Sequence, residues 1–110
     1  MPLDLPKLRK LVSLDESDPL SRFALGKKLF EEGTDPAMLR EAAEHLRFAN
    51  QTAPDHLATY HVLAQAFLGL GLKDEARRVL DAGIQKSADF AHGMGRDLGP
   101  LMQDMLRSLE

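Results

Sequence analysis

The residues that could do chemistry in this chain are scattered, and their spacing does not match a metal-binding motif. The four histidines are His45, His56, His61 and His92. His56 and His61 lie five positions apart, off a common helical face, and the other two belong to different elements. The chain has no cysteine and no HExxH sequence. We therefore expect no metal site and no cofactor, and we interpret the histidines as solvated or groove-lining.

The remaining polar residues do not indicate an enzyme. No serine stands in a nucleophile elbow or has an assigned base near it. The segment Gly93-x-Gly95-x3-Gly99 resembles a phosphate-binding loop superficially, but no strand precedes it and its last spacing is wrong for a dinucleotide fingerprint. We interpret this segment as a flexible connection. We keep catalysis only as a residual hypothesis and expect no catalytic residues.

The charge distribution argues against nucleic acid as a partner. The formal net charge is −3, so no global positive field gathers phosphates. One basic cluster, interleaved with leucines, fits the wet face of a short helix: Lys7, Arg9 and Lys10. The acidic groups that we expect on solvated faces are Glu31 with Glu32, and Glu41 with Glu44.

Hydrophobic content places the chain among ordinary globular domains, with 44% hydrophobic and 28% charged residues. Its 110 residues suit a single domain. No apolar run has the length of a membrane span, and the first fourteen residues lack the apolar core of a signal peptide. With no cysteine to require an oxidising compartment, we expect a cytoplasmic protein without membrane contact.

Helix signals dominate the chain. Asp18-Pro19 and Asp35-Pro36 each place an N-cap before a proline at the first helical position, and Asp74 can cap a later helix. Apolar residues recur at three- and four-residue steps, while no strand-length run alternates. The pattern predicts an all-α protein with helices near 19–32, 36–52, 55–69, 74–87 and 99–109, and a short helix before them that buries Leu5, Leu8, Leu11 and Val12.

Two of the predicted helical hairpins repeat each other. The first carries Arg22-x2-Leu25-Gly26-x2-Leu29, then Ala42-x3-Leu46-x2-Ala49 and Pro54; the second carries Tyr60-x2-Leu63-Ala64-x2-Phe67, then Ala76-x3-Leu80-x2-Gly83 and Ala88. Small residues let the two helices of each hairpin approach closely, and bulky ones fill the space around that contact. The small residues near the end of each second helix, Ala49 and Gly83, would admit the next hairpin.

In order and spacing, these hairpins resemble the tetratricopeptide repeat family. The resemblance covers 19–88 and departs from the family pattern in three ways. Arg22 stands where an aromatic residue is usual, Ala88 replaces a helix-ending proline, and the first repeat is about four residues longer than the usual 34 or so. The division that we expect is an N-terminal flanking helix (1–18), two repeats (19–54 and 55–88), and a glycine-rich connection with a C-terminal capping helix (89–110).

The resemblance also implies where a partner would bind, because the first helix of each repeat lines a concave face in this family. On the non-core side of these helices, the candidate partner-binding residues are Leu20, Phe23, Lys27, Phe30, His61, Gln65 and Leu68, with Ala58 beside them. This apolar surface has few polar handles and suits an amphipathic helix or an apolar segment of another protein. In the alternative interpretation, Phe23 and Phe30 are core residues under a terminal helix.

Two repeats are fewer than the three or so that a stable solenoid needs. We therefore expect the flanking helices to cover the ends, with Met102, Met105, Leu106 and Leu109 of the last helix packing on the second repeat. A homodimer that buries the same surfaces without a separate ligand is the alternative function.

Overall fold

The structure, a computed structural model, describes residues 4–33, 35–90 and 94–109. In this part of the chain it contains helices and no strand. They are α1 (Leu5–Leu14), α2 (Pro19–Glu32), α3 (Pro36–Thr52), α4 (Leu57–Gly69), α5 (Lys73–Ser87), the 3₁₀ turn η1 (Ala88–Phe90) and α6 (Met94–Ser108). The all-α prediction is confirmed.

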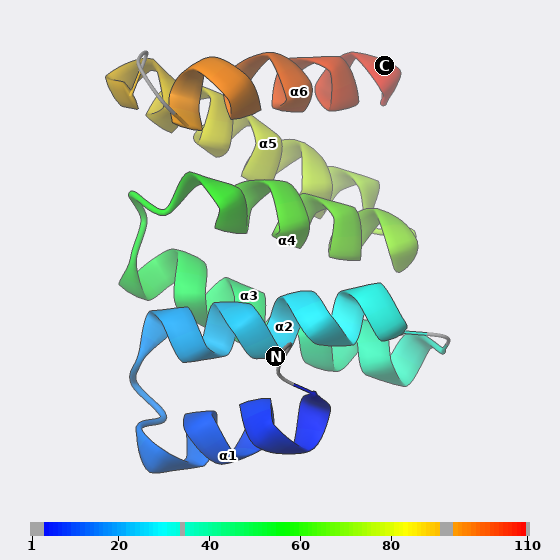
Figure 1. The fold of residues 1–110 in the computed structure, drawn as a ribbon. Helices are drawn as coiled ribbons and strands as arrows, with labels where there is room; N and C mark the ends of the chain where they lie inside the picture. The colour runs from blue at the N-terminus through cyan, green and yellow to red at the C-terminus, as the bar shows by residue number, and fades with distance from the viewer. Residues whose placement is uncertain (1–3, 34, 91–93, 110) are drawn as a thin grey trace.

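The helices stack along one axis (Figure 1). α1 lies at one end and α6 at the other, and neighbours in the sequence run antiparallel. α2, α4 and α6 therefore run in the same direction, and α4 contacts both α2 and α6. α3 and α5 lie behind them in the view of Figure 1. This layer of α2, α4 and α6 is the face that positions the candidate site.

The predicted starts of α2 and α3 are confirmed by their caps. The carboxylate of Asp18 accepts a hydrogen bond from the N–H of Leu20 at 3.2 Å, and that of Asp35 accepts one from Met38 at 2.9 Å. A proline follows each cap, where its missing N–H costs no helical hydrogen bond.

The prediction that Asp74 caps α5 is wrong. α5 begins at Lys73 with Leu72 as its N-cap, and no side chain bonds to the first turn. The preceding turn is made by Gly71, whose φ of +76° favours glycine. Asp74 instead lies in the first turn, where its charge complements the helix dipole, and it pairs with Arg77 at 3.2 Å.

Each hairpin closes over a small residue, as the spacing predicts. A Cβ atom on Gly26 would lie 2.7 Å from Cγ of Leu46 and 3.1 Å from the carbonyl oxygen of Ala42. In the second hairpin, Ala64 and Ala76 are fully buried. The main core continues from these contacts through α1 to α5, and a second cluster joins α4, α5 and α6.

The segment predicted as a flexible loop is helical from Met94 onward. α6 starts five residues before the expected position, and Gly95 and Gly99 are buried inside it; Gly93 and His92 lie outside the described residues. A Cβ on Gly95 would overlap the carbonyl oxygen of Phe90, and one on Gly99 would lie 2.9 Å from Oγ of Ser87. These glycines are present because two helices meet closely there.

The flanking helices cover the ends of the repeats with most of the predicted side chains. Met102 is fully buried, and Met105, Leu106 and Leu109 pack beside it. In α1, Leu8 and Val12 are buried and Leu5 packs against the core. Leu11 was expected in that stripe, but it is 40% exposed because it lies on the flank of α1.

Candidate functional site

The surface of α4 is restricted to one stripe. Before its last residue, Gly69, every residue of this helix is buried except Ala58, His61, Gln65 and Leu68. These four follow the three- and four-residue spacing of one helical face. They include all the partner-binding candidates predicted on α4. The floor of the α2–α4–α6 face is therefore made by these side chains.

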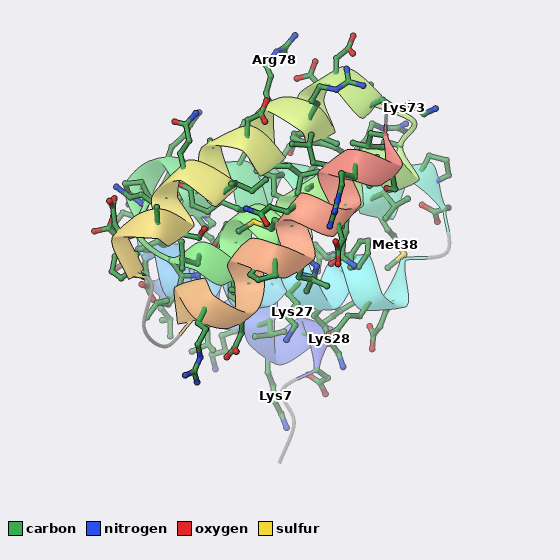
Figure 2. All side chains as sticks on the ribbon, turned by 90° about the horizontal axis from the view of Figure 1, so that it is seen from above. Lys7, Lys27, Lys28, Met38, Lys73 and Arg78 are labelled. Carbon is green, nitrogen blue, oxygen red and sulfur yellow. The ribbon has the colours of Figure 1, made fainter. Side chains whose placement is uncertain are left out.

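The predicted residues on α2 divide into a rim and a packed row. Leu20 is 58% exposed and Lys27 is exposed, whereas Phe23 and Phe30 are half-buried and pack against the main core. Figure 2 shows Lys27 on the side of the molecule away from Arg78. The two phenylalanines thus combine both interpretations, because each supports the core and keeps part of its surface accessible.

The packed row continues into the loop before α4. The ring of Phe23 meets the imidazole of His56 edge to face, with centroids 4.7 Å apart and an angle of 73° between the planes. His56 Nδ1 lies 2.7 Å from Oγ1 of Thr59, which is buried. This contact fixes the start of α4 against α2.

His61 is the titratable group of this stripe. Partial burial lowers its pKa below the ordinary 6.5, because desolvation disfavours the imidazolium. The side chain is therefore neutral at pH 7 and offers one donor and one acceptor beside Gln65, one helical turn away. The face is apolar with neutral polar handles at its centre.

α6 contributes a third wall that the sequence analysis did not assign to the site. Its Gly95 and Gly99 side faces α5, and another flank carries Leu101, which is 44% exposed, and Met105, which packs against the cluster that joins α4, α5 and α6. Leu101 and Met105 are four residues apart, so they share that flank. The sequence analysis predicted only that this helix caps the second repeat. The spacing of Leu101 and Met105 could have indicated a second apolar flank.

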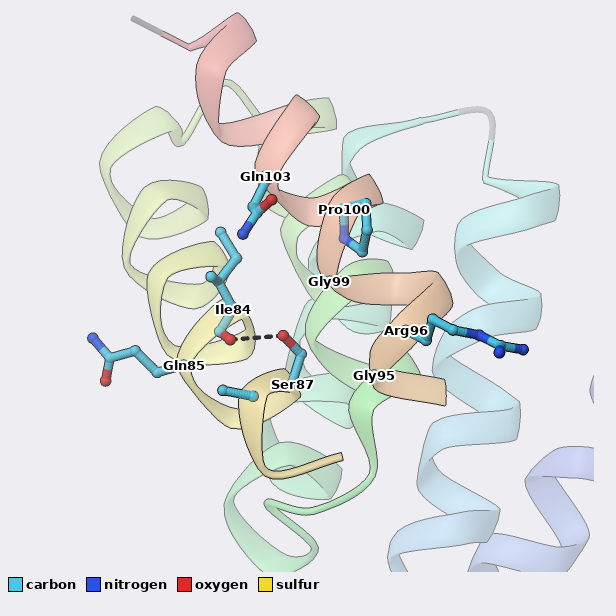
Figure 3. Close-up of a pocket in the computed structure, with 9 residues that line it drawn as sticks. Ile84, Gln85, Ser87, Gly95, Arg96, Gly99, Pro100 and Gln103 are labelled. Atoms are coloured by element: carbon cyan, nitrogen blue, oxygen red, sulfur yellow. Dashed lines mark hydrogen bonds between the residues drawn. The ribbon is translucent and has the colours of Figure 1, made fainter. Parts of the chain in front are cut away.

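A hollow of about 500 Å³ lies elsewhere, between the end of α5 and the first half of α6 (Figure 3). Ile84, Pro100 and small residues form much of its wall, and Gln85 and Arg96 point away from its centre. The buried Ser87 hydroxyl already donates to the carbonyl oxygen of Ile84 at 2.7 Å. This hollow opens at the α6 end of the stack rather than on the predicted face.

Arg22, which replaces the usual aromatic residue, packs as an aromatic would. Its guanidinium carbon lies 4.3 Å from the centroid of the Phe48 ring, and its Nε donates to the carbonyl oxygen of Glu16 at 2.8 Å. Its Nη1 also lies 3.3 Å from Nδ1 of His45. The substitution therefore secures the loop between α1 and α2.

Glu41 lies on a partly exposed face, as expected, but it is paired with side chains of two helices. Its carboxylate accepts two hydrogen bonds from the guanidinium of Arg9, at 2.5 and 3.1 Å, and lies 3.3 Å from Nε2 of His45. The bonds from Arg9 lower the pKa of Glu41, with a smaller contribution from His45. This ion pair fastens α1 to α3, two helices distant in the sequence.

Within residues 4–33, 35–90 and 94–109, no three His, Asp or Glu side chains gather closely enough to hold a metal ion. In the same part of the chain, no helix has the length and apolar character needed to cross a bilayer. His92 lies outside the described residues.

Comparison with known proteins supports the architecture. A protein of Shewanella amazonensis named Xaa-Pro dipeptidase is 33% identical over an alignment of 92 residues that covers 81% of this chain. The chain spans about a fifth (21%) of that relative's length. No solved structure matches significantly. The family model described as Tetratricopeptide repeat matches residues 29–93, which is more than half of the sequence and includes the end of α2, all of α3 and the whole second hairpin. With its paired helices closing over Gly26 and Ala64, the chain belongs to the tetratricopeptide repeat family.

Proposed function

We propose that the chain is a protein-binding module that holds a segment of a partner across the face of α2, α4 and α6. Tetratricopeptide repeats generally mediate contacts between proteins and typically serve as scaffolds. The observation that carries the proposal is the stripe on α4. A helix buried on every other side leaves only Ala58, His61, Gln65, Leu68 and its last residue accessible, and two parallel helices flank that stripe.

The chemistry of this face favours an apolar segment with a few hydrogen-bonding groups. Leu20 and Leu101 expose apolar surface on the two walls, and neutral His61 and Gln65 lie on the floor. Covering these two polar groups without replacing their water contacts would cost about 1–3 kcal/mol each. A bound amphipathic helix or apolar strand would therefore place a polar group of its own opposite them.

Selection from a displayed library of amphipathic-helical and apolar peptides tests the proposal, with binding measured by titration calorimetry. We expect Leu20→Asp and Lys27→Glu to weaken the selected peptides about tenfold or more, which corresponds to roughly 1.4 kcal/mol. These residues are exposed, so both variants should fold.

Arg78→Glu is the matched control, because Arg78 is exposed on the opposite side of the molecule (Figure 2). Peptides that bind the Leu20 and Lys27 variants unchanged, or that lose affinity only in the control, would show that the partner uses another face.

The similarity to part of a protein named for dipeptide hydrolysis supports a second candidate, a module that acts beside a peptidase. In this proposal the chain binds and does not cleave, because the shared region is about a fifth of that relative. Incubation of the purified chain with Xaa-Pro dipeptides, followed by detection of free proline, should show no hydrolysis. Release of proline in proportion to protein concentration would assign the activity to this chain.

A further inference from the structure

The two ends of the helical stack are formed by α1 and α6 (Figure 1). At the α1 end, Leu14 is 73% exposed and Leu11 is 40% exposed. At the α6 end, the hollow of about 500 Å³ opens between α5 and α6. One end thus presents protruding leucines, and the other presents an apolar hollow.

The outer face of α1 combines one apolar group with positive charge. Leu8 and Val12 point into the core, so helical periodicity places Lys7, Lys10 and Leu14 on the far side. Lys10 and Leu14 are four residues apart and are stacked along that side. We call these three residues the α1 outer face.

The hollow at the other end has a matching layout. Its apolar part is formed by Ile84 and Pro100, and the hydroxyl of Ser87 within it is already hydrogen-bonded to Ile84 (Figure 3). An apolar side chain can therefore contact Ile84 and Pro100 without breaking the Ser87 hydrogen bond, and Gln103 is the polar side chain that lies beside it in the hollow. Four residues before Gln85, on the same side of α5, the exposed carboxylate of Asp81 makes no ion pair within the described residues.

The spacings on the two surfaces agree when α1 runs antiparallel to α6, the relation that neighbouring helices of this stack already show. Leu14 then enters the hollow beside Gln85, and Lys10 lies beside Asp81, because each pair is separated by four residues. Two acidic residues, Asp15 and Glu16, follow Leu14 in the sequence. In this arrangement they come near the exposed Arg96 at the start of α6. Charges of opposite sign thus meet on both sides of the docked Leu14 side chain.

We propose that this chain associates head to tail, with the α1 outer face of one copy docking into the α5–α6 hollow of a second copy. This inference goes beyond the proposed function and uses neither Leu20 nor Lys27. The contact joins two different surfaces, so it leaves one free surface at each end of the pair and allows further copies to add.

A single helix of ten residues covers less than the roughly 800 Å² per partner of a stable interface. We therefore expect a dissociation constant of about 0.1–1 mM, typical of small transient contacts. Sedimentation velocity of the full chain from about 10 μM to about 2 mM should show a weight-average mass that rises beyond that of a dimer.

Two blocked variants test the direction of the contact. Leu14→Asp blocks the α1 end, and the double variant Arg96→Glu, Gln85→Asp blocks the α6 end; all three positions are exposed. Each variant alone should remain monomeric. Their equimolar mixture should form a dimer and stop there, because one intact surface of each kind remains. Leu20→Asp, a similarly exposed leucine on the α2–α4–α6 face, is the matched control and should associate like the parent chain.

A parent chain that stays monomeric up to the highest concentration would overturn the proposal. A mixture of blocked variants that remains monomeric would do the same, as would association abolished in Leu20→Asp. A parent chain that stops at a dimer would indicate a symmetric contact instead of a head-to-tail one. Growth beyond a dimer in the parent, together with a mixture limited to dimers, supports it.

Discussion

Met102 packs directly on Gly83: a Cβ atom on this glycine would lie 2.7 Å from Sδ of the methionine. The same Cβ would lie 2.8 Å from Cβ of Tyr60. Gly83 is therefore the point where α4, α5 and α6 meet, and the missing side chain lets α6 approach the second repeat.

Replacing this glycine should separate the three helices. In Gly83→Ala, the gain in helix propensity of about 1 kcal/mol is opposed by overpacking of roughly 1–3 kcal/mol. We expect a net loss in the free energy of unfolding of up to about 2 kcal/mol, measured by urea denaturation. A variant as stable as the parent would mean that Met102 swings aside without cost.

The architecture could be predicted from the sequence because its signals are local. Asp18-Pro19 and Asp35-Pro36 specify helix starts through contacts within three residues, and the small residues at Gly26 and Ala42 fix the hairpin by their spacing. The start of α6 could not be predicted, because glycines near Gly99 have the composition of a loop. Glycine is needed at these positions because α6 passes close to Ser87. Ser87 becomes a neighbour only when the chain has folded.

The candidate face was predictable on α4, where burial follows helical periodicity, and less so on α2. The burial of Phe23 depends on its contact with the ring of His56. His56 lies in the turn before α4, and only the folded chain brings it next to Phe23. The ion pair of Arg9 with Glu41 was beyond sequence reasoning for the same cause, because its partners are 32 residues apart. Contacts between distant side chains carry no periodic signal.

Met102 should carry most of the stability that α6 contributes. It is fully buried, so Met102→Ala leaves a cavity and should lower the free energy of unfolding by about 2–5 kcal/mol. Leu101→Ala is the matched control on the same helix, because that side chain is 44% exposed and should cost less than about 1 kcal/mol. Equal losses in the two variants would place α6 in a different register from the one described.

Because of the Arg9–Glu41 pair, we expect the free energy of unfolding to decrease at acidic pH. The folded pKa of Glu41 lies below its ordinary 4.5, so the unfolded state binds more protons as the pH falls. The stabilisation is present above pH 4.5 and is lost as the pH falls through the folded pKa. Because the pair lies near the surface, its size should be about 0.2–1 kcal/mol.

Urea denaturation at pH 6 and again near the acid end of the folded range measures this effect. Glu41→Gln and Arg9→Met should both show a smaller loss in acid than the parent chain. Identical losses in all three proteins would show that the pair does not persist in solution.

His61 predicts a second pH effect at higher pH. Burial holds its folded pKa below 6.5, so the unfolded chain binds a proton first and stability falls as the pH drops below that value. The parent chain should therefore lose more stability between pH 7.5 and pH 5.5 than His61→Gln does. Chemical denaturation at the two pH values measures the difference, and parallel losses would indicate a solvated imidazole.

Leu20 and Phe30 should separate binding from folding on the same helix. Leu20 is 58% exposed, so Leu20→Ala should change the free energy of unfolding by less than about 0.5 kcal/mol. Phe30 is half-buried against the main core, and Phe30→Ala should cost about 2 kcal/mol, less than a fully buried phenylalanine. If α2 is a wall of the binding face, both variants should also weaken a selected peptide, although only Phe30→Ala weakens the fold. Calorimetric titration well below the melting temperature separates the two effects, because both proteins are then fully folded. Loss of affinity in Phe30→Ala alone would show that its effect comes through the core and would remove Leu20 from the binding face.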